Sequence, residues 1–475
     1  MLASLETPEN TSGGAAMTIK ARLVNENQCQ ACMPLGGAIS FKGIERTVPL
    51  IHGSQGCSTY MRLSTIEHYN EPVDIASSSL NEKQTIMGGE ANLRKALDNV
   101  IRVYRPKVVG VLTTCLSETI GEDMQRMVDA YIKERGLEGV DIIPVSTPSY
   151  SGNQSDGFWA ATRAVIDRYS GPSEKHEGVN VIIPHISTAD IREIKRVVEL
   201  MGVTNYTLIP DYSMTLDRPY GQYSKIAPGG TRTADIARMG GAQATIQLGG
   251  MTCPNELSPG LRLQQEHGVP LINLPLPVGL ENTDRFVEAL QQISGRPVPE
   301  ALSIERGWLL DGMADAHKHN AEGRPVIYGD PELVYAFASA CVENGAIPAV
   351  IATGTRNSPL IARLRMLLAS ADGQPTYIEE ADFAAIEEAA AGARANIAIG
   401  HSGGKCLTER YHIPLVRMGY PIHDRIGGQR ILSAGYAGTL AFLDRLTNTL
   451  LEQKYASYRQ SKKQLLSDIS IEGEL

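Results

Sequence analysis

Apolar positions along most of the chain follow one of two patterns. In the first, apolar residues recur every three or four positions, as at Leu93, Leu97 and Val100, which predicts an amphipathic helix. In the second, several apolar residues follow one another, as at 108–112, which predicts a strand buried on both faces. Pro106 separates these two runs, so this stretch predicts one helix followed by one strand.

The same succession repeats to the end of the chain. A helix predicted at 191–201 stops at Gly202, and another is predicted to begin at Asp330 as its N-cap, with Pro331 in its first turn. Further strands are predicted at 48–51, 142–145, 179–183, 206–209, 326–328, 347–352, 397–400 and 414–416. Strands that alternate with helices are typical of parallel sheets covered on both faces. We therefore predict an α/β fold of three Rossmann-like domains, each a mostly parallel sheet flanked by helices.

The chain length sets the number of domains. A chain of 475 residues is too long for one hydrophobic core, and turn-forming residues at 171–178 and 295–299 mark two boundaries. We predict a flexible N-terminal arm at 1–20, domains at 21–175, 176–297 and 298–456, and a C-terminal tail at 457–475.

Composition narrows the possible partners. The formal net charge of -9, without a run of Lys or Arg, argues against a nucleic-acid partner. No stretch reaches the roughly 18 to 20 apolar residues of a membrane helix, and the polar start contains no signal-peptide core. We expect a soluble, cytoplasmic protein.

Seven cysteines are an odd number for a disulfide framework. Cys253, Cys341 and Cys406 are interpreted as ordinary residues. Cys29 forms a lone C-x-x-C with Cys32, a weak metal-binding signal without a second pair, so we expect a structural or accessory role for it.

Three cysteines stand in loops lined by Gly or Thr: Cys32, Cys57 and Cys115. The loops of Cys57 and Cys115 follow predicted strands, and Cys32 precedes a predicted helix, so the fold can bring all three to one sheet edge. Each alone is most simply a small buried residue. Together they predict thiolate ligands of an iron-sulfur cluster, with the glycines allowing close approach of the backbone to the cluster. Because three thiolates are one short of the usual four, the missing ligands should come from a partner chain.

The loop sequences resemble those of one known family, the β-type subunits of nitrogenase component 1. The most specific strings are His52-Gly53-Ser54-Gln55-Gly56-Cys57 and Thr113-Thr114-Cys115. Thr147-Pro148-Ser149, Glu305-Arg306-Gly307, Tyr328-Gly329-Asp330-Pro331 and residues 417–422 also fit, so the resemblance covers about 32–451. It implies an [8Fe-7S] P-cluster shared with an α-type partner, and an ordinary [4Fe-4S] cluster is the alternative.

The resemblance also implies roles for single residues. Cys57 would bridge the two halves of the cluster, with Cys32 and Cys115 as terminal ligands. Ser149 matches a serine that ligates the oxidised cluster; the alternative is a helix N-cap after Pro148. Tyr60 matches a tyrosine between the cluster and the catalytic cofactor, or is plain interface packing.

Three carboxylates match a mononuclear metal site between two β-type subunits: Glu71, Asp311 and Asp315. Asp311 and Asp315 are one helical turn apart, so both can face one cation. Alternatively, they are simply solvated side chains.

At the level of function, the resemblance implies a subunit of a two-component reductase. The chain has no phosphate-binding G-x-x-x-x-G-K-[ST] string, so ATP hydrolysis would belong to a dimeric iron-sulfur reductase that docks on an α2β2 complex. The catalytic iron-sulfur-carbide-type cofactor would lie in the α-type subunit.

All three thiols are present, and the N-terminal arm is shorter than is usual for nitrogenase β-subunits. With these features the sequence most resembles the β-type subunit of methylthio-alkane reductase, an enzyme that cleaves C–S bonds of small thioethers. A cofactor-assembly scaffold, a nitrogenase β-subunit and a non-redox three-domain ligand-binding protein are the alternatives. The substrate and the metal content of the partner's cofactor stay open.

Overall fold

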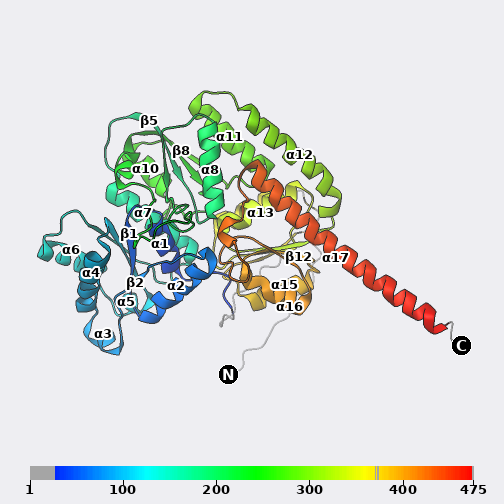
Figure 1. The fold of residues 1–475 in the computed structure, drawn as a ribbon, viewed down its shortest axis with the longest axis horizontal. Helices are drawn as coiled ribbons and strands as arrows, with labels where there is room; N and C mark the ends of the chain where they lie inside the picture. Colours follow the sequence, from blue (N-terminus) through cyan, green and yellow to red (C-terminus); the bar gives the residue numbers. More distant parts are fainter. Residues whose placement is uncertain (1–26, 370, 372–373, 473–475) are drawn as a thin grey trace, which may run out of the picture.

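Three parallel β-sheets, each covered by helices, follow one another along the chain (Figure 1). The computed structural model describes residues 27–369, 371 and 374–472, so the arm predicted at 1–20 lies outside the described residues. The predicted fold class is confirmed.

The first sheet has the strand order β2-β1-β3-β4, all parallel. Its strands are β1 (Thr47–His52), β2 (Ala76–Ser77), β3 (Val108–Thr113) and β4 (Asp141–Val145). Its helices are α1 (Met33–Lys42), α2 (Gln55–Tyr69), α3 (Glu82–Met87), α4 (Glu90–Tyr104), α5 (Cys115–Thr119), α6 (Met124–Arg135) and α7 (Gln154–Tyr169).

The second sheet has the order β6-β5-β7-β8, also parallel. Its strands are β5 (His176–Ile182), β6 (Tyr206–Ile209), β7 (Ala242–Leu248) and β8 (Leu271–Leu274). Its helices are α8 (Thr188–Leu200), α9 (Thr233–Ala237), the 3-10 turn η1 (Met239–Gly241), α10 (Pro259–His267) and α11 (Leu280–Ser294).

The third sheet has five parallel strands in the order β11-β10-β9-β12-β13. They are β9 (Pro325–Tyr328), β10 (Val350–Ala352), β11 (Thr376–Ile378), β12 (Ile397–Gly400) and β13 (Leu415–Arg417). The helices of this part are α12 (Glu300–Asn320), α13 (Pro331–Glu343), α14 (Ser358–Leu367), α15 (Phe383–Gly392), η2 (Ser402–Gly404), α16 (Lys405–Tyr411), η3 (Gly428–Arg430) and α17 (Gly435–Glu472).

The predicted strands occur close to their expected positions because each is a short apolar run buried on both faces, as in β1 and β3. The predicted run 347–352 forms a strand only from Val350, since Pro348 cannot donate to a sheet. Four strands were not predicted: β2, β7, β8 and β11. In β7 the buried Thr245 and Gln247 interrupt the apolar run, so the sequence pattern does not indicate a strand.

One hydrophobic core extends through all three sheets, although the chain length led us to expect separate cores. It includes Leu112 from the first sheet, Ile182 from the second and Ile327 from the third. Smaller cores lie on the other face of the first sheet and of the third sheet. The three sheets are thereby packed into one body.

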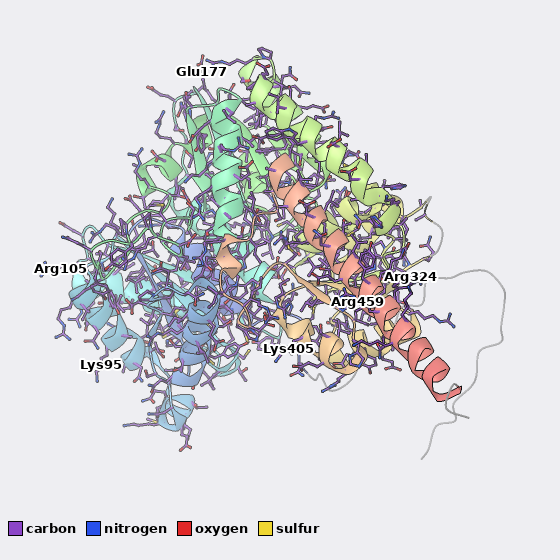
Figure 2. All side chains as sticks on the ribbon, turned by 45° about the vertical axis from the view of Figure 1, so that its right-hand side comes forward. Lys95, Arg105, Glu177, Arg324, Lys405 and Arg459 are labelled. Carbon is purple, nitrogen blue, oxygen red and sulfur yellow. The ribbon has the colours of Figure 1, made fainter. Side chains whose placement is uncertain are left out.

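The last helix is longer than the sequence pattern suggested. Helix α17 packs along α12 and continues through the stretch from 457 that we expected as a polar tail; its end projects from the body (Figure 1). Charged side chains such as Lys95, Arg105 and Arg459 cover the outside of the molecule (Figure 2). Within the described residues, no helix combines the length and apolar character needed to cross a membrane.

Candidate metal centre

The three candidate thiols lie at the carboxyl edge of the first sheet. Strands β1 and β3 are neighbours, and their last residues, His52 and Thr113, are paired in register. The chain leaves β1 toward β2 on one side, whereas β3 continues to β4 on the other, so a topological switch point separates the loops of Cys57 and Cys115. Ligands of open α/β sheets bind in the crevice at such a point.

Each thiol also stands at the start of a helix. Cys32 is the N-cap of α1, Cys57 is the third residue of α2, and Cys115 is the first residue of α5. Free backbone N–H groups at helix starts stabilise thiolate. Burial raises the pKa of Cys57, and negative charge at Cys32 and Cys115 raises it further, so the three thiols lie close enough to interact.

The thiols face solvent in the isolated chain. Cys32 and Cys57 are partly exposed and Cys115 is exposed. The three loops therefore form an open face and not an enclosed cavity, which suits a group shared with a second chain.

Ser149 connects two of the thiol loops. Its backbone N–H donates to the Cys115 Sγ over 3.2 Å, and its Oγ accepts from the Met33 N–H over 3.2 Å. The alternative reading of Ser149 as the N-cap of its own helix is wrong, because Asn153 caps α7. Ser149 instead satisfies the first N–H of α1, next to Cys32.

Hydrogen bonds between the loops hold this edge together. The carbonyl of His52 accepts from Thr114 Oγ1 at 3.2 Å and from Ser117 Oγ at 2.9 Å. Thr147 donates to the Thr113 carbonyl at 2.7 Å. The loops after β1, β3 and β4 are thus fixed relative to one another.

A buried hydrogen-bonded pair of side chains lies behind the loop of Cys57. His52 Nε2 is 2.5 Å from Glu122 Oε2. Although burial alone would raise the pKa of Glu122, its hydrogen bond with His52 holds that pKa below the ordinary value. Sequence reasoning missed this pair because the residues are 70 positions apart.

Gly36 and Gly53 do not have the role that we expected of the loop glycines. We interpreted them as room for a cluster, but a Cβ on Gly36 would lie 1.8 Å from the Gln154 carbonyl oxygen, and one on Gly53 would lie 2.2 Å from Thr114 Oγ1. These glycines allow protein segments to pack against each other. In contrast, Gly56 is exposed, and the nearest atom to its Cβ position is 3.7 Å away.

The donor set fits a polynuclear iron-sulfur group better than a single ion. Among the described residues, no three His, Cys, Asp or Glu side chains are arranged to hold one metal ion. Three thiols spread over an exposed edge can ligate different irons of a cluster. The remaining ligands would then come from outside this chain.

Two cavities meet beside Cys32. One, of about 430 Å³, is lined by Gln30, Cys32, Ser149 and Asn153. The other, of about 510 Å³, is lined by Gln30, Cys32, Tyr60 and His423. Tyr60 is half exposed, and burial together with negative charge at Cys32 raises its pKa.

The three candidate carboxylates do not meet in one chain. Asp311 and Asp315 are exposed on α12. Glu71 follows α2 and lies 3.7 Å from Arg218. A site made by all three therefore needs a second copy of the chain.

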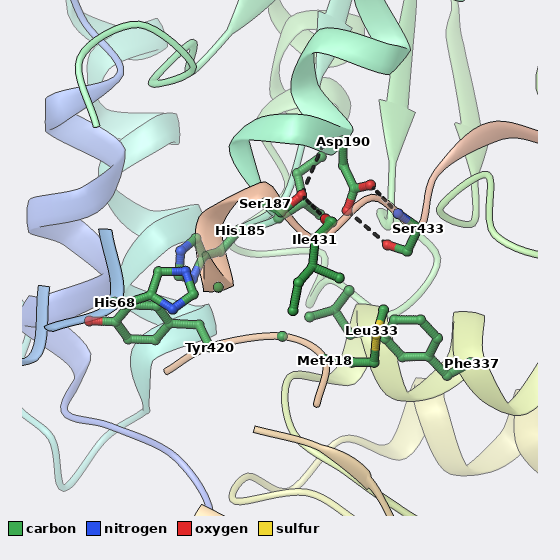
Figure 3. A pocket seen from close by; sticks show the side chains of 13 residues that line it. His68, His185, Ser187, Asp190, Leu333, Phe337, Met418, Tyr420, Ile431 and Ser433 are labelled. Atoms are coloured by element: carbon green, nitrogen blue, oxygen red, sulfur yellow. Dashed lines mark hydrogen bonds between the residues drawn. The ribbon is translucent and has the colours of Figure 1, made fainter. Parts of the chain in front are cut away.

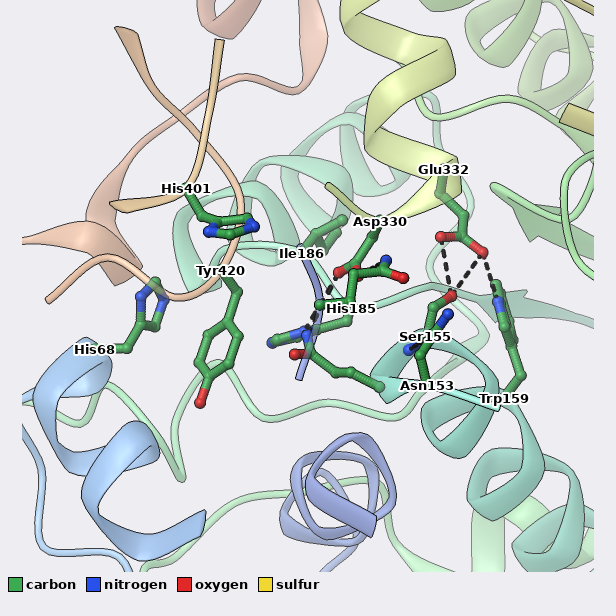
Figure 4. A network of polar contacts seen from close by, with 12 residues as sticks. His68, Asn153, Ser155, Trp159, His185, Ile186, Asp330, Glu332, His401 and Tyr420 are labelled. Atoms are coloured by element: carbon green, nitrogen blue, oxygen red, sulfur yellow. Dashed lines mark hydrogen bonds and ion pairs between the residues drawn. The ribbon is translucent and has the colours of Figure 1, made fainter. Parts of the chain in front are cut away.

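A buried polar network adjoins the first of these cavities (Figure 4). Asp330 Oδ1 accepts from Gln30 Nε2 at 2.7 Å, and Gln154 Nε2 lies 2.8 Å from His185 Nδ1. Glu332 accepts from the Trp159 Nε1–H at 2.7 Å. The prediction that Asp330 is the N-cap residue of α13 is confirmed, but its side chain makes no capping hydrogen bond. An acidic residue directly after a predicted buried strand was the sequence feature that could have indicated this network.

A smaller cavity lies deeper among His68, His185, Tyr420 and Leu333 (Figure 3). Its volume of about 20 Å³ is room for roughly one water molecule, so it does not bind a substrate.

The interpretation of Cys29 as structural agrees with its burial and with its carbonyl, which accepts from His401 Nε2 at 2.6 Å.

Comparisons with known proteins find matches over most of the chain. Residues 32–451 match the family model described as nitrogenase component 1 type oxidoreductase. The nitrogenase molybdenum-iron protein beta chain of Methanococcus maripaludis is 35% identical over 453 residues, which cover 92% of this chain and 96% of that one. The nitrogenase iron-molybdenum cofactor biosynthesis protein NifN of Rhodobacter capsulatus is 31% identical, with 92% and 93% covered. A solved structure of nitrogenase Cp1 at pH 6.5 has a TM-score of 0.86 and 32% identity, with 92% and 95% covered.

Proposed function

Because the chain belongs to the nitrogenase component 1 family, as a β-chain-type member, we propose that it is the electron-relaying subunit of a nitrogenase-like two-component reductase. Cys32, Cys57 and Cys115 would hold one half of an [8Fe-7S] P-cluster, with Cys57 as the bridging ligand. Ser149 would serve as an additional ligand in the oxidised state. When bound, such a group accepts and donates electrons one at a time.

The observation that carries this proposal is the open face on which three thiols interact. The chain's own residues orient the ligands: Ser149 holds the loop of Cys115 against the start of α1, and the loops after β1 and β3 are bonded to each other. Backbone N–H groups near the sulfurs and the exclusion of water by a partner would set the reduction potential.

An α-type subunit would cover this face and carry the catalytic iron-sulfur-carbide-type cofactor, in an α2β2 complex. Tyr60, half exposed beside Cys32, would then lie at the subunit interface. An ATP-dependent dimeric iron-sulfur reductase would supply the electrons. Glu71, Asp311 and Asp315 are proposed as a mononuclear metal site between two β-type subunits.

For the reaction, we propose that the complex cleaves C–S bonds of small thioethers, as methylthio-alkane reductase does. This part of the proposal rests on the resemblance of the sequence. A nitrogenase molybdenum-iron protein beta chain is 35% identical to this chain, with 96% of its own length covered. Nitrogenase activity therefore stays an alternative. An assembly scaffold is a third candidate, because NifN is similar over 93% of its length.

Turnover by the complex tests these candidates. The α/β complex, co-purified anaerobically, is given its ATP-driven reductase with dimethyl sulfide or dinitrogen in parallel. Methane and methanethiol without ammonia support C–S cleavage, and ammonia supports a nitrogenase. Iron bound at the interface with no product from either substrate points to the scaffold, whereas iron-free complex contradicts the proposed cluster.

A further inference from the structure

A carboxyl group of the third domain is hydrogen-bonded to the segment that carries Cys32. Asp330 follows β9, is 5% exposed, and accepts from Gln30 Nε2 over 2.7 Å through Oδ1. Its other oxygen, Oδ2, lies 3.4 Å from Gln154 Nε2. Gln30 is two residues before Cys32, so a single side chain links the acid to the candidate ligand loop.

No charged partner neutralises this acid within the described residues. The basic group nearest to Asp330 is His185, whose Nδ1 is 4.0 Å away. Burial lowers the pKa of His185 to about 3, so the imidazole is neutral, and its Nε2 lies 2.9 Å from the Tyr69 hydroxyl. A buried charge without a counter-ion is costly, and burial with the nearby Glu332 raises the pKa of Asp330 to about 8.

The Gln30 amide is suited to both protonation states of Asp330. Its Nε2 donates to Asp330, as an ionised carboxylate requires, while its Oε1 is buried without a partner. When Asp330 carries a proton, a rotated Gln30 amide presents Oε1 as the acceptor. Gln30 also lines both cavities beside Cys32, through which water can reach the Gln30 side of the pair.

On the proposed function, we infer that Asp330, acting through Gln30, is a positioning residue that couples proton uptake to reduction of the group held at Cys32. Asp330 takes one proton from water when that group gains one electron from the docked reductase, and returns it when the electron leaves. Added negative charge near a buried carboxyl group favours the protonated form of that group.

Other titratable groups also face Asp330. They are Glu332, Asp156, Cys29, His185, Tyr69, Tyr212 and Tyr420. Glu332 has its pKa raised to about 7 by burial, but it bonds to Ser155 and Trp159 and not to Gln30. Glu332 is therefore the control: a buried acid two residues further along the chain, which affects the pKa of Asp330 but has no hydrogen bond to the Cys32 segment.

The test is a redox titration of the anaerobically purified complex, poised with dithionite and mediator dyes and followed by electron paramagnetic resonance between pH 6.5 and 9.5. In the wild type, we expect the redox equilibrium to shift by up to tenfold per pH unit above about pH 8, where Asp330 is ionised before the reduction; this shift is about 59 mV for one electron. Asp330→Asn should remove this slope, and Gln30→Leu should reduce it at unchanged iron content. Glu332→Gln should keep the slope but move it to lower pH, because Glu332 helps to raise the pKa of Asp330.

The outcomes separate the two proposals. A wild-type complex without iron overturns the proposed function and this inference with it. If the wild-type complex holds iron, two results overturn this inference alone. In the first, Asp330→Asn keeps the wild-type slope; in the second, Glu332→Gln loses the slope to the same extent as Asp330→Asn. If Asp330→Asn does not fold, the loss or persistence of the slope in Gln30→Leu decides.

Discussion

Replacing Gly36 by Ala should disturb the candidate metal centre through packing alone. Gly36 lies on α1 where this helix contacts α7, and a Cβ there would stand 1.8 Å from the Gln154 carbonyl oxygen and 2.9 Å from the Phe158 nitrogen. Both atoms belong to the backbone, so no side chain can rotate away. Real Cβ atoms essentially never approach within 3.0 Å, so the two helices must separate by about 1.2 Å, the difference between 3.0 and 1.8 Å.

A displacement of this size is large compared with the contacts that hold Cys32. The Met33 N–H reaches Ser149 Oγ over 3.2 Å, and a further ~1.2 Å breaks a hydrogen bond. Overpacking typically costs about 1–3 kcal/mol, and the lost bond costs about 1 kcal/mol. We therefore expect Gly36→Ala to lower the free energy of unfolding by about 2–4 kcal/mol and to reduce the iron bound per complex.

The matched control is Gly392→Ala. Gly392 is exposed at the end of α15, and a Cβ there meets nothing within 4 Å, so Ala should stabilise the helix by up to about 1 kcal/mol. The measurements are the urea midpoint and the iron content of the co-purified complex. A Gly36→Ala complex with wild-type midpoint and iron would refute the reasoning.

Three more predictions concern the centre and its surroundings. Cys57→Ala should remove most of the cluster iron while Cys406→Ala does not; equal iron in both complexes contradicts the assignment. Ser149→Ala removes the acceptor of Met33 and should cost about 1 kcal/mol in urea unfolding, whereas an unchanged midpoint would show that this contact is unimportant. Because burial raises the pKa of Asp330 from 3.8 to about 8, the native state holds a proton in that window that the unfolded chain lacks. The free energy of unfolding should therefore fall between pH 4 and 8, and less steeply in Asp330→Asn; parallel curves would count against this.

Much of the fold could be predicted from local pattern. Strands such as β1, β3 and β12 are short apolar runs, and helices such as α4 and α8 show regular apolar spacing. These signals lie within a few residues of each other, so a pass along the chain finds them. Where polar side chains are buried inside a strand, as in β7, the signal fails because the tertiary environment satisfies them.

The sequence by itself determined which residues offer thiols and that they lie at strand and helix ends. Only the tertiary structure decided what surrounds them. It showed that Gly36 serves helix packing, that Ser149 joins two loops, and that Gln30 meets Asp330, which is 300 positions away. Such contacts depend on how the sheets pack into one core, and no local pattern of apolar and polar residues encodes them.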